Sequence, residues 1–151
     1  MPPVKPSNPI DPIRYVLDTD IVTHQQLGNR IVLQHLHQVN LSEVATTVIT
    51  MYEQLRGRLA EINRNQADVQ LQLAYHRLQL TQTYYCSARV LPFDDKAAQV
   101  YRMLIAQKLR IGGQDLKVTA IVLAHNAILV TANRRHFDQV PELTIEDWTR
   151  L

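Results

Sequence analysis

The stretch Ile13-Arg-Tyr-Val-Leu-Asp-Thr-Asp20 is an apolar run that stops abruptly on two carboxylates, Asp18 and Asp20. Its centre, residues 15–17, has the composition of a short buried strand. In open α/β sheets, ligands bind outside the carboxyl ends of the strands, so an acid at this point is placed to hold a metal ion or attack a substrate. Asp can equally cap a helix, because its side chain accepts hydrogen bonds from the free N–H groups at a helix start. The stretch alone leaves both alternatives open.

Strand-like and helix-like segments alternate along the rest of the chain. The apolar side chains of residues 67–86 predict a long amphipathic helix that packs in the core, with a partner-binding groove as the alternative. Alternating strands and helices predict an α/β fold, in which a parallel β-sheet is flanked by α-helices. Strands are expected at residues 15–17, 44–47, 89–93, 127–130 and 143–145, and helices at 21–27, 31–39, 48–58, 67–86, 95–109 and 114–125.

Length and composition predict one soluble globular domain. The 151 residues are 46% hydrophobic and 20% charged, with a net charge of +2, which is too small to indicate nucleic-acid binding by itself. We expect a flexible, proline-rich leader at residues 1–12 and a single domain at residues 13–151. No apolar run is long enough to span a membrane, and no secretory signal is recognisable. The single cysteine, Cys86, excludes an internal disulfide and fits a reducing cytoplasm.

Four polar groups occupy comparable positions relative to the predicted strands. Asp18 follows the first strand, Glu53 and Asp115 lie early in helices, and Asn133 follows the strand at residues 127–130. Right-handed βαβ crossovers bring successive strand ends to one edge of a sheet, so these side chains can converge. Three neighbouring carboxylates repel unless a cation neutralises them, and Mg²⁺ or Mn²⁺ prefers such oxygen ligands. Taken singly, Glu53 could instead be a solvated helix residue and Asp115 a partner of the helix dipole.

Several motifs resemble those of VapC-type PIN-domain toxins. In the C-terminal half these are Ile111-Gly-Gly-Gln-Asp-Leu-Lys-Val-Thr-Ala120, Ala127-Ile-Leu-Val-Thr-Ala-Asn133, Phe137-Asp-Gln-Val-Pro-Glu-Leu143 and Trp148. In the N-terminal half they are Leu-Asp-Thr-Asp at 17–20, Thr-Val-Ile-Thr-Met-Tyr-Glu-Gln-Leu-Arg-Gly at 47–57 and Leu-Pro-Phe-Asp at 91–94. The resemblance runs from about residue 14 to residue 148 in family order and spacing.

This resemblance implies a PIN-like fold with a metal-dependent endoribonuclease site. The family pattern places Asp18, Glu53 and Asp115 as the acids that hold Mg²⁺, with Mn²⁺ as the alternative ion, Asn133 at the fourth position and Thr131 orienting the site through its hydroxyl. A metal-activated water would then hydrolyse the RNA phosphodiester bond. The resemblance also implies a cognate antitoxin that blocks the site, a homodimer, and an antitoxin segment lying in a hydrophobic groove.

Three positions bear on how closely the chain follows the family pattern. Asp20 stands where the family often has Asn, and it could either orient the metal-binding residues without touching the metal or cap the helix. Thr119 stands where Ala is usual, and its hydroxyl could reach Asp115 or bond its own helix. The neutral Asn133, shared with part of the family, gives a weaker metal contact than a carboxylate would.

Basic residues lie next to the third and fourth site positions. Lys117 follows Asp115 by two residues, and Arg134, Arg135 and His136 follow Asn133 directly. Arginine forks can hold RNA phosphates bidentately, so Lys117, Arg134 and Arg135 are predicted to bind substrate. A solvated basic loop is the alternative.

Two other functions are compatible with parts of the pattern. The Asp18-Thr-Asp20 ending resembles the nucleophile and acid of haloacid-dehalogenase-type phosphatases, but that family needs a later lysine and a paired-acid strand end. The later strand here ends in Thr131-Ala-Asn133, and no Gly-Asp pair occurs. A PIN-like interaction module without activity is the other alternative, although all three acids are present.

Overall fold

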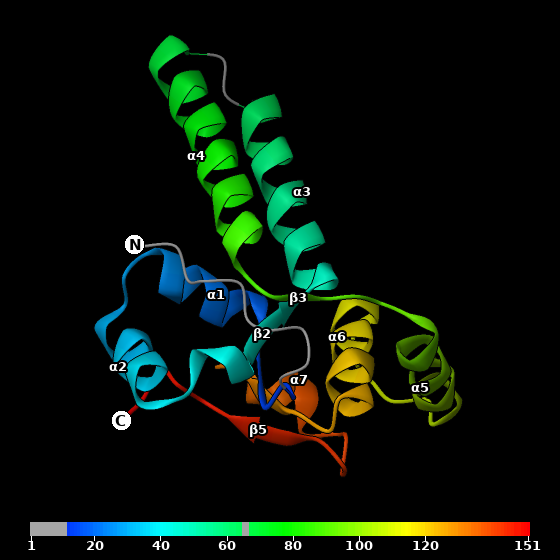
Figure 1. Ribbon diagram of the computed structural model, residues 1–151. Helices are drawn as coiled ribbons and strands as arrows, with labels where there is room; N and C mark the ends of the chain where they lie inside the picture. The colour runs from blue at the N-terminus through cyan, green and yellow to red at the C-terminus, as the bar shows by residue number, and fades with distance from the viewer. Residues whose placement is uncertain (1–11, 65–66) are drawn as a thin grey trace.

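A computed structural model of the protein describes residues 12–64 and 67–151 (Figure 1). Five parallel strands form one sheet in the order β3-β2-β1-β4-β5. The predicted leader lies, apart from Pro12, outside the described residues. The strands are β1 (Tyr15–Leu17), β2 (Val44–Thr47), β3 (Val90–Leu91), β4 (Ile128–Val130) and β5 (Thr144–Glu146). The α-helices of the described chain are α1 (Thr19–Gln26), α2 (Arg30–Gln38), α3 (Val48–Arg64), α4 (Asp68–Ser87), α5 (Asp95–Ala106), α6 (Gly113–Ala124) and α7 (Arg134–Phe137).

Side chains of β1 alternate between the two faces of the sheet, as the two-residue period of a strand requires. Val16 belongs to one hydrophobic cluster, whereas Tyr15 and Leu17 belong to another. All three are buried, which identifies β1 as a central strand covered on both faces. The prediction of a parallel sheet flanked by helices is confirmed.

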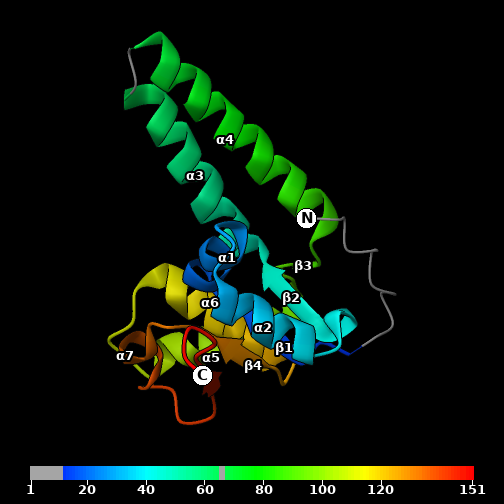
Figure 2. The same cartoon turned by 90° about the vertical axis from the view of Figure 1, so that its left-hand side faces the viewer.

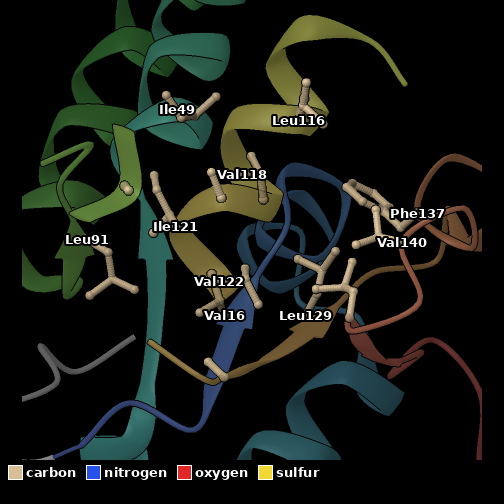
Figure 3. Packing of buried hydrophobic residues seen from close by; sticks show 14 of the residues in the cluster. Val16, Ile49, Leu91, Leu116, Val118, Ile121, Val122, Leu129, Phe137 and Val140 are labelled. Carbon is tan, nitrogen blue, oxygen red and sulfur yellow. The ribbon is translucent and has the colours of Figure 1, made fainter. Parts of the chain in front are cut away.

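The larger cluster joins the sheet to α6, α5 and the start of α3. Figure 3 shows Val16 of β1 beside Val122 of α6, and Leu129 of β4 on the side of Phe137 and Val140. Phe137 of α7 is fully buried at the edge of the same cluster. Helix α6 is thus the central helix of this face, and it carries Asp115 in its first turn.

The opposite face of the sheet is covered by α1, α2 and the C-terminal segment. Ile21 and Val22 of α1 are completely buried there, and Trp148 is 2% exposed. The Trp148 ring lies against both Tyr15 and the His35 ring of α2, with centroid distances of 5.1 and 5.6 Å. Because α1 begins directly after β1, this packing fixes the direction in which residues 18–20 leave the sheet.

Helices α3 and α4 form an arm that projects from the body of the protein (Figures 1 and 2). The predicted core packing of the 69–85 stripe is wrong for three of its members, because Val69, Leu73 and Leu80 are 78%, 44% and 55% exposed. Over most of its length α4 packs along α3 alone, so only one of its faces is covered. The buried residues on that face are Ala74 and Thr81.

Several boundaries differ from the predicted ones. Helix α3 continues to Arg64 instead of ending near residue 58, β3 has only two residues, and α7 forms in a segment for which no helix was predicted. Gly28 and Asn126 adopt positive φ angles of 74° and 49° at the ends of α1 and α6, where glycine and asparagine commonly end helices. Among the described residues, no helix is long and apolar enough to cross a membrane.

Candidate active site

The predicted site residues come from four separate segments that meet at the carboxyl edge of the sheet. Asp18 directly follows β1, Glu53 lies in the second turn of α3 after β2, and Asn133 follows β4. Asp115 lies in the first turn of α6. All four line one cleft of about 380 Å³, together with Thr19, Asp20, Thr23 and His24. The predicted convergence is therefore present in the structure.

Asp18 is buried and bonded to the end of the neighbouring strand. Its backbone N–H donates to the Val130 carbonyl at 3.0 Å, and its Oδ2 accepts a 3.0 Å hydrogen bond from the Thr131 hydroxyl. Asp18 occupies the N-cap position of α1 but makes no side-chain capping bond to it. The capping alternative therefore does not account for a carboxylate here.

Asp20 links the start of α1 to the loop after β4. Its Oδ1 accepts from the Ile21 backbone N–H at 2.8 Å, and its Oδ2 accepts from the Ala132 backbone N–H at 2.9 Å. Both oxygens thus have a backbone donor, and the side chain holds the loop that carries Asn133. In that loop, the Asn133 backbone N–H donates to the Thr131 hydroxyl at 3.1 Å.

Glu53 is oriented by a hydroxyl from α1. The Thr19 Oγ1 lies 3.2 Å from Oε2 of Glu53 and 3.2 Å from Oγ1 of Thr50. Glu53 is neither buried nor fully solvated, and it lies on the face of α3 that turns toward the cleft. A freely solvated helix residue is therefore not a sufficient description of it.

Asp115 bonds a histidine of α7. The Nδ1 atom of His136 lies 2.9 Å from Oδ2 of Asp115, and the Asn133 amide nitrogen lies 2.9 Å from the same Nδ1. Because an ionised carboxylate only accepts hydrogen bonds, the His136 Nδ1–H donates to Asp115. The hydroxyl of Thr119 donates to the Asp115 backbone carbonyl at 2.8 Å, so it bonds its own helix rather than the carboxylate.

Burial and mutual repulsion disfavour the charged forms of the acids. Burial, followed by the nearby Asp20 carboxylate, raises the pKa of Asp18 from 3.8 to about 7, against the opposing effect of the hydrogen bonds from Thr19 and Thr131. Burial also raises the pKa of Asp20 and, with the Asp115 charge as a smaller contribution, that of Glu53. The cleft therefore has an excess of negative charge that a cation would relieve.

The chemistry of the donors fits a hard divalent cation, whereas their spacing is wide. Carboxylate and amide oxygens line the cleft, as Mg²⁺ and Mn²⁺ prefer. Within residues 12–64 and 67–151, however, no three His, Cys, Asp or Glu side chains stand close enough together to hold one ion directly. Mg²⁺ commonly keeps several waters and takes only one or two protein carboxylates, so the residues present fit the ion.

The predicted substrate-binding residues flank the cleft without lining it. Lys117 is half-buried on α6, and Arg134 and Arg135 are exposed on α7. The Arg134 Nε lies 4.0 Å from Asp138, an exposed pair that adds little stability. A larger hollow of about 460 Å³ is lined by residues of α4 only, and therefore lies on the arm rather than at the sheet edge.

Known proteins resemble the chain in both sequence and fold. It is 25% identical over 138 residues to Ribonuclease VapC1 of Haemophilus influenzae, which covers 90% of this chain and 98% of that protein. It is 35% identical over 65 residues to Ribonuclease VapC2 of Rickettsia felis, and this match covers 40% of this chain and 48% of that protein. No protein-family model matches the chain.

Two solved structures give the fold. VapBC-1 from nontypeable Haemophilus influenzae superposes with a TM-score of 0.72 and 22% identity, over 91% of this chain and 100% of that chain. DNA-bound VapBC from Salmonella typhimurium also gives 0.72, with 21% identity over 90% of this chain and 98% of that chain. The chain is similar to VapC1 along most of its length. The resemblance to VapC-type PIN-domain proteins, inferred from the motifs, is confirmed.

Sequence analysis missed four contributors to this site. Thr19, Thr23 and His24 line the cleft, and His136, noted only as a basic neighbour, bonds Asp115. His24 could have been found, because it lies four residues after Asp20 on α1 and therefore on the same helix face. The contact from His136 could not be predicted, because it depends on α7, a helix of four residues that is too short to show a helical pattern in the sequence.

Proposed function

We propose that this protein is a metal-dependent endoribonuclease that acts as the toxin of a toxin–antitoxin pair. The observation that carries the proposal is the convergence of Asp18, Glu53, Asp115 and Asn133 on one cleft at the carboxyl edge of the sheet. The names of the sequence relatives, Ribonuclease VapC1 and VapC2, support the nuclease activity. VapBC toxin–antitoxin complexes among the structural relatives support an antitoxin partner.

The acids would hold Mg²⁺, with Mn²⁺ as a substitute. When bound, the ion would polarise a phosphoryl oxygen of RNA and lower the pKa of a water. Asp18 would provide the most buried carboxylate, held in place by Thr131. Asp115, Glu53 and the neutral Asn133 line the same cleft and would contact the ion through its bound waters.

The remaining residues would position the RNA and the loop. Arg134 and Arg135 are exposed at the rim beside Asn133, where they can reach the phosphates that flank the scissile bond. Lys117 would add positive charge from α6. Asp20 supports the site by holding the backbone at Ala132 rather than by contacting RNA.

We further propose a cognate antitoxin, a homodimer and a cytoplasmic location for this chain. The chain would then be harmless in cells while the antitoxin is bound. Light scattering of the purified chain, alone and after co-expression with an adjacent antitoxin gene, tests both assembly predictions.

The central test is cleavage of a structured RNA by the purified chain. Cleavage with Mg²⁺, its loss with EDTA, its return with excess Mg²⁺ or Mn²⁺, and products with 5′-phosphate ends are expected. Asp18→Ala should abolish cleavage, whereas the matched control Asp95→Ala changes an exposed acid on α5 and should cleave normally. Equal cleavage by wild-type and Asp18→Ala protein would contradict the proposed mechanism.

The same experiment separates the two alternatives. A haloacid-dehalogenase-type phosphatase would release phosphate from small monoesters, yet no lysine is among the described residues that line the cleft. An inactive PIN-like module would leave RNA intact under all metal conditions. Growth inhibition by the wild type but not by Asp18→Ala would distinguish an active toxin from such a module.

A further inference from the structure

Thr19 lies between two of the candidate metal-binding acids, next to Asp18 in sequence and hydrogen-bonded to Glu53. It directly follows Asp18 in the chain, and its hydroxyl lies 3.2 Å from Oε2 of Glu53. Thr19 begins α1, whereas Glu53 belongs to α3, 34 residues later. It is therefore the residue through which the turn after β1 reaches the acid on α3.

The direction of the hydroxyl bond follows from the chemistry of the pair. An ionised carboxylate has no proton to give, so the Thr19 hydroxyl donates to Glu53. Its lone pairs then remain to accept from the Thr50 hydroxyl at 3.2 Å. Thr50 is completely buried, and its own backbone N–H donates to the Thr47 hydroxyl at 3.1 Å.

This arrangement gives Glu53 a defined position although its helix alone would not. A glutamate side chain has three rotatable bonds and loses rotamer freedom when it is held in one place. Within the described part of the chain, the Thr19 hydroxyl is the one hydrogen-bond donor found for the Glu53 carboxylate. Removing it would leave the carboxylate free to turn out of the cleft.

We propose that Thr19 is a positioning residue that holds Glu53 at the metal-binding cleft. The proposal rests on the proposed function, because it gives Glu53 the role of a metal-binding acid. Thr19 acts on the ion through Glu53 and need not touch RNA. Partners that orient metal ligands typically contribute about 10–100-fold to metal affinity or activity.

Three variants test this role in the full chain. Thr19→Val keeps the shape of the side chain and removes the hydroxyl, whereas Thr19→Ser keeps the hydroxyl. Thr83→Val is the matched control, because Thr83 is exposed on α4 and its hydroxyl bonds the Gln79 carbonyl of its own helix. Titration calorimetry with Mn²⁺, in the absence of RNA, measures the affinity, and thermal unfolding checks that each variant is folded.

Thr19→Val should weaken Mn²⁺ binding about tenfold, while Thr19→Ser stays within about twofold of wild type. In a Glu53→Ala background, Thr19→Val should cause no further loss, because the two residues act as one unit. RNA cleavage by Thr19→Val should recover when Mn²⁺ is raised about tenfold. If Thr19→Val does not fold, the comparison of Thr19→Ser with Thr19→Ala decides the same question.

Three results would overturn the role of Thr19. These are unchanged Mn²⁺ affinity in Thr19→Val, an equal loss in Thr19→Ser, and a full further loss in the Glu53→Ala background. A wild-type protein that binds Mn²⁺ but leaves RNA intact would instead contradict the ribonuclease proposal alone, since the affinities are measured without RNA. A wild-type protein that binds no Mn²⁺ would overturn both.

Discussion

The Thr131 hydroxyl donates a 3.0 Å hydrogen bond to Oδ2 of Asp18 and so joins the ends of β4 and β1, 113 residues apart in the chain. The Thr131 hydroxyl oxygen also accepts a 3.1 Å hydrogen bond from the backbone N–H of Asn133. Thr131 is completely buried and Asp18 is 7% exposed. One hydroxyl thereby fixes both the most buried acid and the loop that carries the fourth site position.

Thr131→Val should therefore impair both stability and metal binding. Losing the two hydrogen bonds should lower the free energy of unfolding by about 1–3 kcal/mol. Without its hydroxyl donor, the pKa of Asp18 should rise from its wild-type value of about 7, and Mn²⁺ affinity should fall about tenfold near neutral pH. Denaturant unfolding and Mn²⁺ calorimetry between pH 6 and pH 8.5 (about the span that brackets this pKa) measure the two effects.

Thr119→Val provides the control for that variant. Thr119 is also completely buried, but its hydroxyl bonds the Asp115 backbone carbonyl within α6. This change should leave the pH dependence of Mn²⁺ binding as in the wild type. Equal shifts in the two variants would mean that the contact between Thr131 and Asp18 has no special role.

The metal-free protein should gain stability when the charge of Asp18 is removed. The folded pKa of Asp18 is about 7, above the ordinary value of 3.8, so the folded state binds the proton more tightly than the unfolded state. The penalty is absent below about pH 4, grows as the pH rises to 7, and is complete above 7. Asp18→Asn should therefore raise the free energy of unfolding by roughly 1–3 kcal/mol at pH 8 and hardly at all at pH 4.

Urea unfolding of both proteins at pH 4, 6 and 8 (about the three stages of this titration) measures that difference, with EDTA present to exclude ions. Added Mn²⁺ should stabilise the wild type at pH 8 and not Asp18→Asn. A stability difference that is the same at all three pH values would show that Asp18 titrates normally in the folded protein.

Much of the fold could be predicted because residue types along the chain indicate where strands begin and end. The predicted strands at residues 15–17 and 44–47 are β1 and β2 with the observed bounds. The arm could not be predicted in the same way. An amphipathic stripe such as that of α4 shows which residues are apolar, but not whether the facing surface belongs to the core, a partner or solvent.

The candidate site was predictable at the level of its acids but not of its supports. Strand ends of a parallel sheet meet at one edge, and this rule brings Asp18 and Asn133 together from opposite ends of the chain. Which hydroxyl bonds which acid depends on rotamers and helix orientation. The contact between Thr19 and Glu53 therefore required the packed arrangement of α1 against α3.

Asp20→Asn should show that this acid anchors a loop rather than binding metal. Both carboxylate oxygens accept backbone N–H groups, and an amide would satisfy only one of them. RNA cleavage should fall about tenfold, as for other residues that orient a site. Because the Asp20 charge raises the pKa of Asp18, the midpoint for Mn²⁺ binding should move to lower pH. A loss of Mn²⁺ binding as complete as in Asp18→Ala would instead identify Asp20 as a ligand.

The same substitution should have a small effect at one residue of α4 and a large effect at the next. Leu73 is 44% exposed, whereas Ala74 is completely buried where α4 packs along α3. Leu73→Glu should change the free energy of unfolding by less than about 0.5 kcal/mol, as surface substitutions usually do. Ala74→Glu places a charge between the two helices and should open the arm, which hydrogen exchange would detect as faster exchange in α3 and α4 than in α6. Equal protection of the arm in the two variants would contradict the packing described for α4.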